Sequence, residues 1–303
     1  MYRQIDSNKR KTWLLMFMFL VLVAFIGFIF GQATSLGYGI VVVAVAFAFL
    51  TNFFAYYYSD RVALAISGAK EITGSQNQEL YRLVENLCIA SGLYMPALYV
   101  IDDTAPNAFA AGRDPQHAVI VVTKGLLEKL DKQEIEGVIS HELSHIKDYD
   151  IRLMTIVVVL AGLVVLMSDL FLRWTFYSPR GSRRSSSGQG SGQAQAIILV
   201  IALVLALLAP ICAQLIKFSI SRKREFLADA EGAMMTRYPE GLARALEKIS
   251  ADQEPLEVAN KATAHLYIAN PLKGKGQENF LARMFSTHPP IEERIAALRG
   301  MEK

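Results

Sequence analysis

The chain has 303 residues, of which 52% are hydrophobic and only 19% are charged. Soluble domains carry about 25% charged residues, so this composition excludes an ordinary soluble protein or a disordered chain and favours a membrane protein. The 31 Lys and Arg residues against 28 Asp and Glu residues give a net charge of +3, which is not the basic balance of a nucleic-acid-binding protein. Cys88 and Cys212 are too few for a disulfide framework, and we expect both to be buried apolar residues.

Four apolar stretches are long enough to cross a bilayer, which takes about 20 helical residues. These stretches are 13–30, 37–57, 153–172 and 196–217. Pro210 in the fourth stretch is expected to bend that helix rather than end it. A short uncharged loop joins the first two stretches, so we expect a retained amino-terminal hairpin and not a cleaved secretory signal.

Basic residues predict the orientation of these helices, because they are enriched at cytosolic ends. Arg3, Lys9, Arg10 and Lys11 precede the first stretch, which places the amino terminus and the segment 59–152 in the cytosol. Four arginines between the third and fourth stretches, at 173, 180, 183 and 184, conflict with two full crossings there. Whether the third and fourth stretches cross the membrane twice or not at all, the segments before and after them lie on the same side. We therefore expect a multi-pass protein of the cytoplasmic (inner) membrane with its polar domain in the cytosol.

The polar residues are expected to form one domain that is split by the second hydrophobic hairpin. The predicted division is an amino-terminal hairpin at 1–58, a first part of the polar domain at 59–152, a second hairpin at 153–217 with a Ser/Gly/Arg-rich linker at 178–195, and a second part of the polar domain at 218–303. The predicted elements, in chain order, are a helix over 80–88 with Ser75 as its cap, strands at 97–102 and 118–123, a helix that begins with Asp131 and Glu134 and runs toward the third apolar stretch, helices at 225–237 and 239–250, and a last helix from about Pro290.

The most informative motif is His141-Glu142-Leu143-Ser144-His145, within one of the predicted helices. Positions four apart share a helical face, so both imidazoles can reach one metal ion and the intervening Glu can reach a water on it. Zinc suits these ligands, and a catalytic zinc site has three protein ligands and one open position. The motif therefore predicts one Zn²⁺ per chain. The alternative is an amphipathic helix with two ordinary surface histidines.

The third ligand must lie elsewhere, because residues 146–150 contain no histidine. The best candidate is Glu225, which follows the fourth apolar stretch just as His145 precedes the third, so an antiparallel hairpin would bring them together. Asp229, one helical turn later, is placed to accept a hydrogen bond from the far nitrogen of a ligating histidine. The alternative for Glu225 is a solvated carboxylate beside the basic residues 222–224.

These motifs resemble those of the HtpX-type membrane zinc metalloproteases, gluzincins related to the CAAX prenyl protease. The resemblance includes Ser-Arg-Lys-Arg-Glu-Phe-Leu-Ala-Asp-Ala at 221–230, Pro-Asn-Ala-Phe-Ala at 106–110, Thr-His-Pro-Pro at 287–290, Glu-Arg-Ile at 293–295 and the amino-terminal hairpin. It covers most of the chain, although the Ser/Gly/Arg-rich linker is not matched.

The resemblance implies roles for particular residues. His141, His145 and Glu225 would bind zinc, and Glu142 would be the general base. The segment Asn107, Ala108, Phe109 and Ala110 resembles a substrate-edge segment that pairs with an extended peptide by strand addition, the alternative being a buried turn. His288 would approach the metal or the oxyanion, the alternative being a residue at the entry of the last helix. His117 and His265 have no partner pattern and are taken as ordinary.

The sequence thus predicts a mainly α integral membrane protein with four hydrophobic helices and a zincin-like α+β catalytic domain that carries a small sheet. The resemblance implies an endopeptidase that acts on unfolded or damaged membrane proteins at the cytosolic face, in quality control under stress, with the bilayer as a partner and homo-oligomerisation left open. The alternatives are a prenyl-protein protease or a zinc-binding scaffold without turnover, although Glu142 argues against the scaffold. A transporter is disfavoured, because Asp169 is the only obvious acidic residue inside an apolar stretch and lies near its end.

Overall fold

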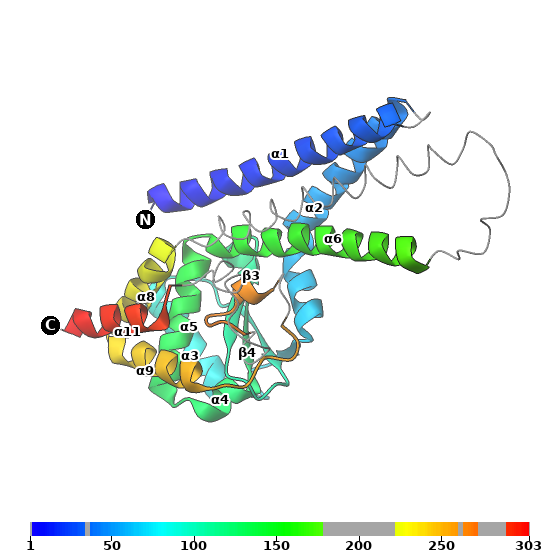
Figure 1. Ribbon diagram of the computed structural model, residues 1–303. Coiled ribbons are helices and arrows are strands. Elements are labelled where there is room, and N and C mark those ends of the chain that lie inside the picture. The colour runs from blue at the N-terminus through cyan, green and yellow to red at the C-terminus, as the bar shows by residue number, and fades with distance from the viewer. Residues whose placement is uncertain (1, 34–36, 178–221, 260–262, 272–288, 303) are drawn as a thin grey trace.

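The computed structural model describes residues 2–33, 37–177, 222–259, 263–271 and 289–302 (Figure 1). The linker at 178–195, the fourth apolar stretch at 196–217 and His288 lie outside the described residues. The helices and strands described below follow the labels of Figure 1.

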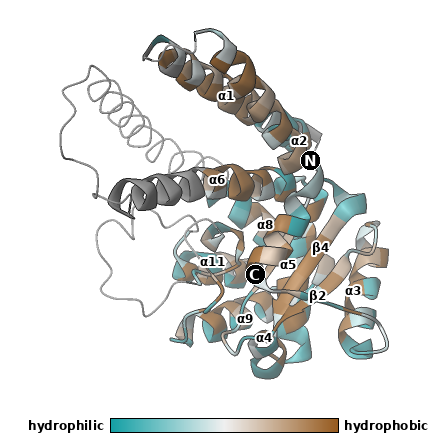
Figure 2. Ribbon diagram, turned by 90° about the vertical axis from the view of Figure 1, so that its right-hand side faces the viewer, coloured by the Kyte–Doolittle hydropathy of each residue, from teal (hydrophilic) through white to brown (hydrophobic). Residues whose placement is uncertain are grey.

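Two long apolar helices form an antiparallel hairpin that extends away from the rest of the chain (Figures 1 and 2). They are α1 (Tyr2–Ala33) and α2 (Gly39–Ser67). In their most apolar windows only 28% and 17% of the residues are buried, whereas the core helix of a soluble protein would be mostly buried. Within the described residues, these two helices are long and apolar enough to cross a membrane, as the sequence predicts for the first two stretches.

A third long helix, α6 (Asp150–Tyr177), contains the third predicted stretch and packs against the hairpin. Apolar side chains of all three helices meet there, among them Phe19 of α1, Ala55 of α2 and Ile156 of α6. A buried amide reinforces the hairpin, since Asn52 Nδ2 donates to the Met16 carbonyl oxygen at 2.9 Å. The first turns of α6 therefore pack against both the hairpin and the polar domain.

The polar domain is built on a mixed sheet of four strands in the order β1-β2-β4-β3. The strands are β1 (Lys70–Ile72), β2 (Ala97–Ile101), β3 (Ala108–Gly112) and β4 (Ala118–Thr123). β2 and β4 run parallel, while β1 and β3 are antiparallel edge strands. The two predicted strands are confirmed. Pattern alone did not reveal β1, which has only three residues.

Both faces of this sheet are covered, because β4 sends alternate side chains to two apolar clusters. Ile120 and Val122 join the cluster made with α3 and α5. Val119 and Val121 join the cluster made with α6 and with Leu256, Ala259, Leu266 and Tyr267. The first face is covered by α3 (Gln78–Ser91) and α5 (Lys132–Lys147), with the short α4 (Lys124–Lys129) between β4 and α5. Asn77, not the predicted Ser75, caps α3 by accepting a hydrogen bond from Leu80 N–H.

The carboxyl-terminal helices pack on the other side of α5 (Figure 1). They are α8 (Arg222–Thr236), α9 (Pro239–Ala251) and α11 (Ile291–Arg299), with the 3-10 turns η2 (Ala264–Leu266) before α11 and η3 (Gly300–Glu302) after it; another 3-10 turn, η1 (Pro115–His117), lies between β3 and β4. These helices match the predicted ones. As a result, α5 is central to the domain, with the sheet on one side and α8 and α9 on the other.

The chain turns sharply between α5 and α6, where the sequence offers no Gly or Pro to interrupt the helix. α5 ends at Lys147, and Tyr149 adopts a left-handed conformation with φ of 61°. This conformation is uncommon for a residue other than glycine. It changes the direction of the chain, so that α6 leaves the domain toward the hairpin.

The close packing of α9 on α5 requires a glycine at position 137. A Cβ atom there would lie 2.6 Å from the backbone nitrogen of Leu242, which is closer than Cβ atoms normally come to backbone atoms. Any larger residue at this position would push α9 away from the helix that carries the histidines.

We therefore expect Gly137→Ala to destabilise the protein by about 1–3 kcal/mol, the usual cost of overpacking. The measurement is the thermal unfolding midpoint in detergent. Gly162→Ala is the matched control, because it is also in a helix and no described atom lies within 4 Å of the added Cβ. Equal midpoints for the two variants would show that α5 and α9 are not packed so closely.

Candidate metal centre

Helix α5 presents the three residues of the His-Glu-His motif. A capping box fixes the start of this helix, since Asp131 accepts from Glu134 N–H and the Glu134 side chain accepts from Asp131 N–H. Three turns later His141, Glu142 and His145 are all buried, with at most 5% of each residue exposed. Ordinary surface histidines are therefore excluded.

Helix α8 supplies the third member of the cluster, as the sequence predicts. Glu225 is 2% exposed, and its carboxylate oxygens lie 3.9 Å from His141 Nε2 and 3.6 Å from His145 Nε2. Gly232, two turns further along α8, allows this approach, because a Cβ there would lie 3.0 Å from His141 N. Glu225 is thus not the solvated carboxylate of the alternative interpretation.

The three side chains have the spacing of a zinc site. One ligand atom from each lies within 4.8 Å of the others, and the two Nε2 atoms are 3.2 Å apart. Ligands at about 2.0–2.1 Å from a tetrahedral zinc ion lie roughly 3.3 Å from each other. Two imidazoles and one carboxylate therefore fit zinc, with the fourth position left for water or substrate.

Asp229 and Arg294 fix the orientation of His141. The His141 Nδ1 atom lies 2.9 Å from Asp229 Oδ1, which is the contact that the sequence predicts for Asp229. Arg294 of α11, fully buried, donates two hydrogen bonds to Asp229, at 2.8 and 2.7 Å. Burial alone would raise the pKa of Asp229, but the charge and hydrogen bonds of Arg294 and the His141 contact outweigh it and hold this pKa below its usual value.

Asp150 is the corresponding partner of His145, and sequence reasoning did not identify it. Its Oδ2 atom lies 2.9 Å from His145 Nδ1. The left-handed Tyr149 brings Asp150 back toward the preceding helix, and no glycine in the sequence marks that turn. Each histidine therefore has a carboxylate on its far nitrogen, as ligating histidines in metalloproteins usually do.

The charges around the imidazoles also fit a divalent cation. The buried carboxylates here are Glu142, Glu225, Asp229 and Asp150. Among the described residues, Arg294 pairs with Asp229 and its Nη1 atom also lies 3.7 Å from a Glu225 oxygen, while Arg224 pairs with Asp150. Two guanidinium groups thus face four buried carboxylates, and a divalent cation would offset the excess of negative charge.

Glu142 differs from the other three carboxylates because it forms no ion pair with a lysine or arginine in the part of the chain that the structure describes. Burial raises the pKa of Glu142 to about 7, and the negative charge of Glu225 adds to the effect, while His141, a hydrogen bond from the Ala110 backbone and the charge of Arg294 act against it. A dication beside it would lower this pKa. The Glu142 carboxylate lies between α5 and strand β3.

The segment from Asn107 to Ala110 enters the edge strand β3, so the alternative of a buried turn is wrong for residues 108–110. Part of this edge has internal partners. The Ala108 carbonyl oxygen accepts from Ile268 N–H at 3.0 Å, and the Asn107 side chain donates to the Ala269 carbonyl oxygen at 3.2 Å. Phe109 points to the opposite face and packs edge-on against Tyr267.

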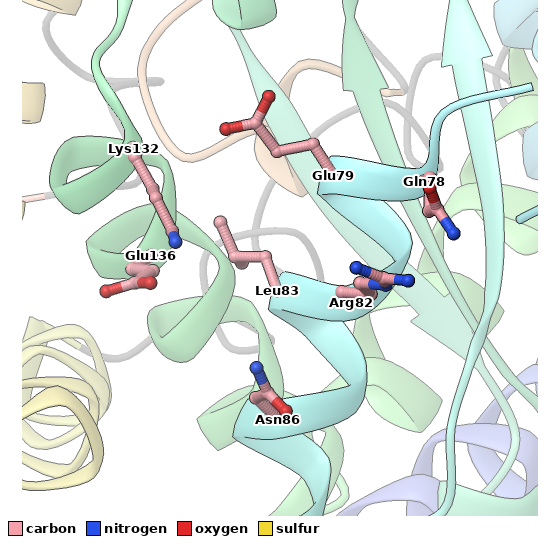
Figure 3. Close-up of a pocket in the computed structure, with 7 residues that line it drawn as sticks. All are labelled: Gln78, Glu79, Arg82, Leu83, Asn86, Lys132 and Glu136. Carbon is pink, nitrogen blue, oxygen red and sulfur yellow. The ribbon is translucent and has the colours of Figure 1, made fainter.

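The remaining described histidines lie outside the cluster. His117 pairs with Asp114 at the surface, and the buried His265 contacts the carbonyl oxygen of Met154. A separate hollow of about 350 Å³ lies between α3 and the start of α5, and Figure 3 shows the residues that line it. It is lined by Gln78, Glu79, Arg82, Leu83, Asn86, Lys132 and Glu136. None of these residues belongs to the histidine cluster, so this hollow is not the metal centre.

Comparison with known proteins agrees with this geometry. Residues 74–302 match the family model "Peptidase family M48". The chain belongs to this family. Proteins named "Protease HtpX homolog" from Dictyoglomus thermophilum and Dictyoglomus turgidum are 48% and 46% identical over 300 residues, which is 99% of this chain and 94% of theirs. A protein of the same name from Tropheryma whipplei (strain Twist) is 42% identical over 301 residues, with 99% and 98% covered.

A solved structure shares the fold. The crystal structure of S. mikatae Ste24p aligns with a TM-score of 0.51 at 19% identity, over 98% of this chain and 67% of that one. The M48 family is zinc-dependent, and the His-His-Glu cluster could hold that ion. The protein is therefore a membrane metalloprotease that hydrolyses peptide bonds.

We expect Asp229→Asn to weaken zinc binding by about 10–100-fold, the usual effect of losing a carboxylate that orients a ligating histidine. Zinc affinity of the purified protein is measured by competition with a chelator. The control is Asp114→Asn, which changes a carboxylate–imidazole pair at the surface and should leave the affinity unchanged. A parent-like affinity in Asp229→Asn would exclude this role for Asp229.

Proposed function

We propose that this protein is a zinc endopeptidase in which His141, His145 and Glu225 hold one zinc ion and Glu142 is the general base. The convergence of the three ligand atoms within 4.8 Å carries this proposal. The buried carboxylate of Glu142, on the same helix and next to strand β3, supports the assignment of the base.

The chemistry follows from what each group contributes. A bound zinc ion would polarise the peptide carbonyl and lower the pKa of water toward neutrality. Glu142 accepts a proton from the attacking water and returns it to the leaving amine. Arg294 and Asp229 hold His141 in one orientation, and Asp150 does the same for His145. The reaction therefore uses groups whose positions are fixed before substrate arrives.

We further propose that an extended peptide binds along β3 by strand addition, in contact with Asn107, Ala108, Phe109 and Ala110. β3 is an edge strand, and its Ala110 N–H faces Glu142. A peptide that pairs with the Ala108 carbonyl oxygen has to replace the bond from Ile268 N–H. Main-chain pairing of this kind suits substrates of many sequences, provided that they are unfolded.

The proposed setting is the cytosolic side of the inner membrane, with four hydrophobic segments and a catalytic domain split between 59–152 and 218–303. Aromatic and basic side chains lie together at the end of the hairpin next to the polar domain. There Arg61, Arg113 and Arg152 lie over the rings of Tyr58, Tyr57 and Tyr56, respectively. Tyrosine is enriched at membrane surfaces and arginine at cytosolic ones. This arrangement supports a membrane boundary close to the metal centre.

The proposed substrates are unfolded or damaged membrane proteins, and the proposed role is quality control under stress. The likeness to proteins named HtpX homologs supports it. The position of the site supports it too, because α6 begins five residues after His145. A chain that emerges from the bilayer is thereby close to the cluster.

We expect Glu142→Gln to retain about one zinc ion and to lose 10²-fold or more of its cleavage rate on an unfolded protein, because only the proton acceptor is removed. Zinc content and cleavage are measured on protein purified in detergent without chelator. Zinc with no cleavage by the parent would favour a scaffold without turnover, and cleavage confined to a farnesylated carboxyl-terminal peptide would favour a prenyl-protein protease. Absence of zinc from the parent would contradict the proposed ligands.

The orientation is tested with single cysteines in a chain whose native cysteines are replaced. We expect a membrane-impermeant maleimide to label Tyr38→Cys, in the loop between α1 and α2, on intact cells. Glu85→Cys, on the exposed face of α3, should react only after lysis. Labelling of Glu85→Cys on intact cells would place the catalytic domain outside.

A further inference from the structure

The first membrane helix reaches the groups around the metal cluster through one buried amide. Asn8 of α1 is 3% exposed, although it lies more than 130 residues before the motif in the chain. Its Nδ2 atom donates to the Asp150 carboxylate and, at 2.8 Å, to the Asp148 carbonyl oxygen. Its Oδ1 atom accepts from Arg224 Nη1 at 2.7 Å. Both donors and the acceptor of the amide are therefore used.

One of these partners of Asn8 contacts a proposed ligand, and another is next to a proposed ligand in the chain. Asp150 uses its other oxygen, Oδ2, to hold His145 Nδ1 at 2.9 Å. Arg224, which also contacts Asp150, immediately precedes Glu225. Asn8 thus contacts both Asp150, which orients the proposed ligand His145, and Arg224, which precedes the proposed ligand Glu225.

The turn that carries Asp150 is also held by α1. Tyr149 has the left-handed conformation that is unfavourable for a side chain of this size. Lys9 places its ammonium group 4.4 Å from the centre of the Tyr149 ring, and Asn8 bonds the carbonyl oxygen of Asp148. Consecutive residues of α1 therefore contact both residues before Asp150, and this strained turn depends on the position of α1.

We propose that Asn8 is a positioning residue for zinc, which acts through Asp150 on His145 and thereby couples the placement of the first membrane helix to the geometry of the metal site. A displacement of α1 relative to the domain would release the Asp150 carboxylate from Asn8 and loosen the orientation of His145. The inference rests on the proposed ligand set. It adds that the site is complete only when α1 is docked.

The test compares zinc affinity of full-length variants in detergent, measured by chelator competition. Asn8→Leu removes all three hydrogen bonds of the amide, and we expect it to weaken zinc binding about tenfold or more. The matched control is Asn52→Leu, which removes a buried amide that joins α2 to α1 without touching the cluster. Asn52→Leu should bind zinc as the parent does. If Asn8→Leu does not fold, Asn8→Ala replaces it.

A coupled pair of variants separates positioning from general stability. In an Asp150→Ala background, Asn8→Leu should cause no further loss of zinc affinity, because the residue through which it acts is absent. The visible spectrum of the Co²⁺-substituted protein should change in Asn8→Leu and stay parent-like in Asn52→Leu.

Three results would overturn the inference: equal zinc affinities for the Asn8 and Asn52 variants, independent effects of Asn8→Leu and Asp150→Ala, or an unchanged Co²⁺ spectrum in Asn8→Leu. A parent protein without zinc would instead overturn the proposed ligand set. The failure of the inference is therefore distinguishable from the failure of the proposed function.

Discussion

The structure depends on keeping four carboxylates buried around two imidazoles. An isolated buried carboxylate is costly, so each of these groups needs a partner, and the partners come from distant parts of the chain. Arg294 arrives on α11, Arg224 on α8 and Asn8 on α1. A divalent ion held by the proposed ligands would offset the remaining excess of negative charge. The packing of α8, α9 and α11 around α5 is therefore the framework that brings these charges to one point.

The same constraint links the catalytic domain to the membrane helices. The left-handed Tyr149 lets the chain turn from the histidine helix α5 into α6, which packs on the hairpin. Because Asp150 is both the first residue of α6 and the partner of His145, the start of the helix that packs on the hairpin also contributes to the candidate metal site. This arrangement explains how one polar domain can be assembled from two segments separated by hydrophobic stretches.

The sequence predicts the residues that share a helix, and Glu225 from the order of the apolar stretches, but it misses the other residues that meet through tertiary packing. The pairs His141 and His145, and Glu225 and Asp229, follow from the four-residue spacing of helices, whereas Glu225 was joined to the histidines by the expected antiparallel hairpin; the structure brings all four together. Asp150 was missed because no Gly or Pro marks the turn before it. Asn8 and Arg294 could not be assigned by spacing, since their contacts span 142 and 65 residues. β1 has three residues, too few for a detectable alternation.

The most direct test of this account is to locate the zinc ion by anomalous diffraction at the zinc absorption edge in crystals of the full-length protein. The account predicts one anomalous peak per chain, about 2.0–2.2 Å from His141 Nε2, His145 Nε2 and a Glu225 oxygen. It also predicts that Asp229 and Asp150 still contact the far nitrogens of the two histidines. A peak on other residues, or zinc held by the histidines without Glu225, would contradict the assembly of the site from α5 and α8.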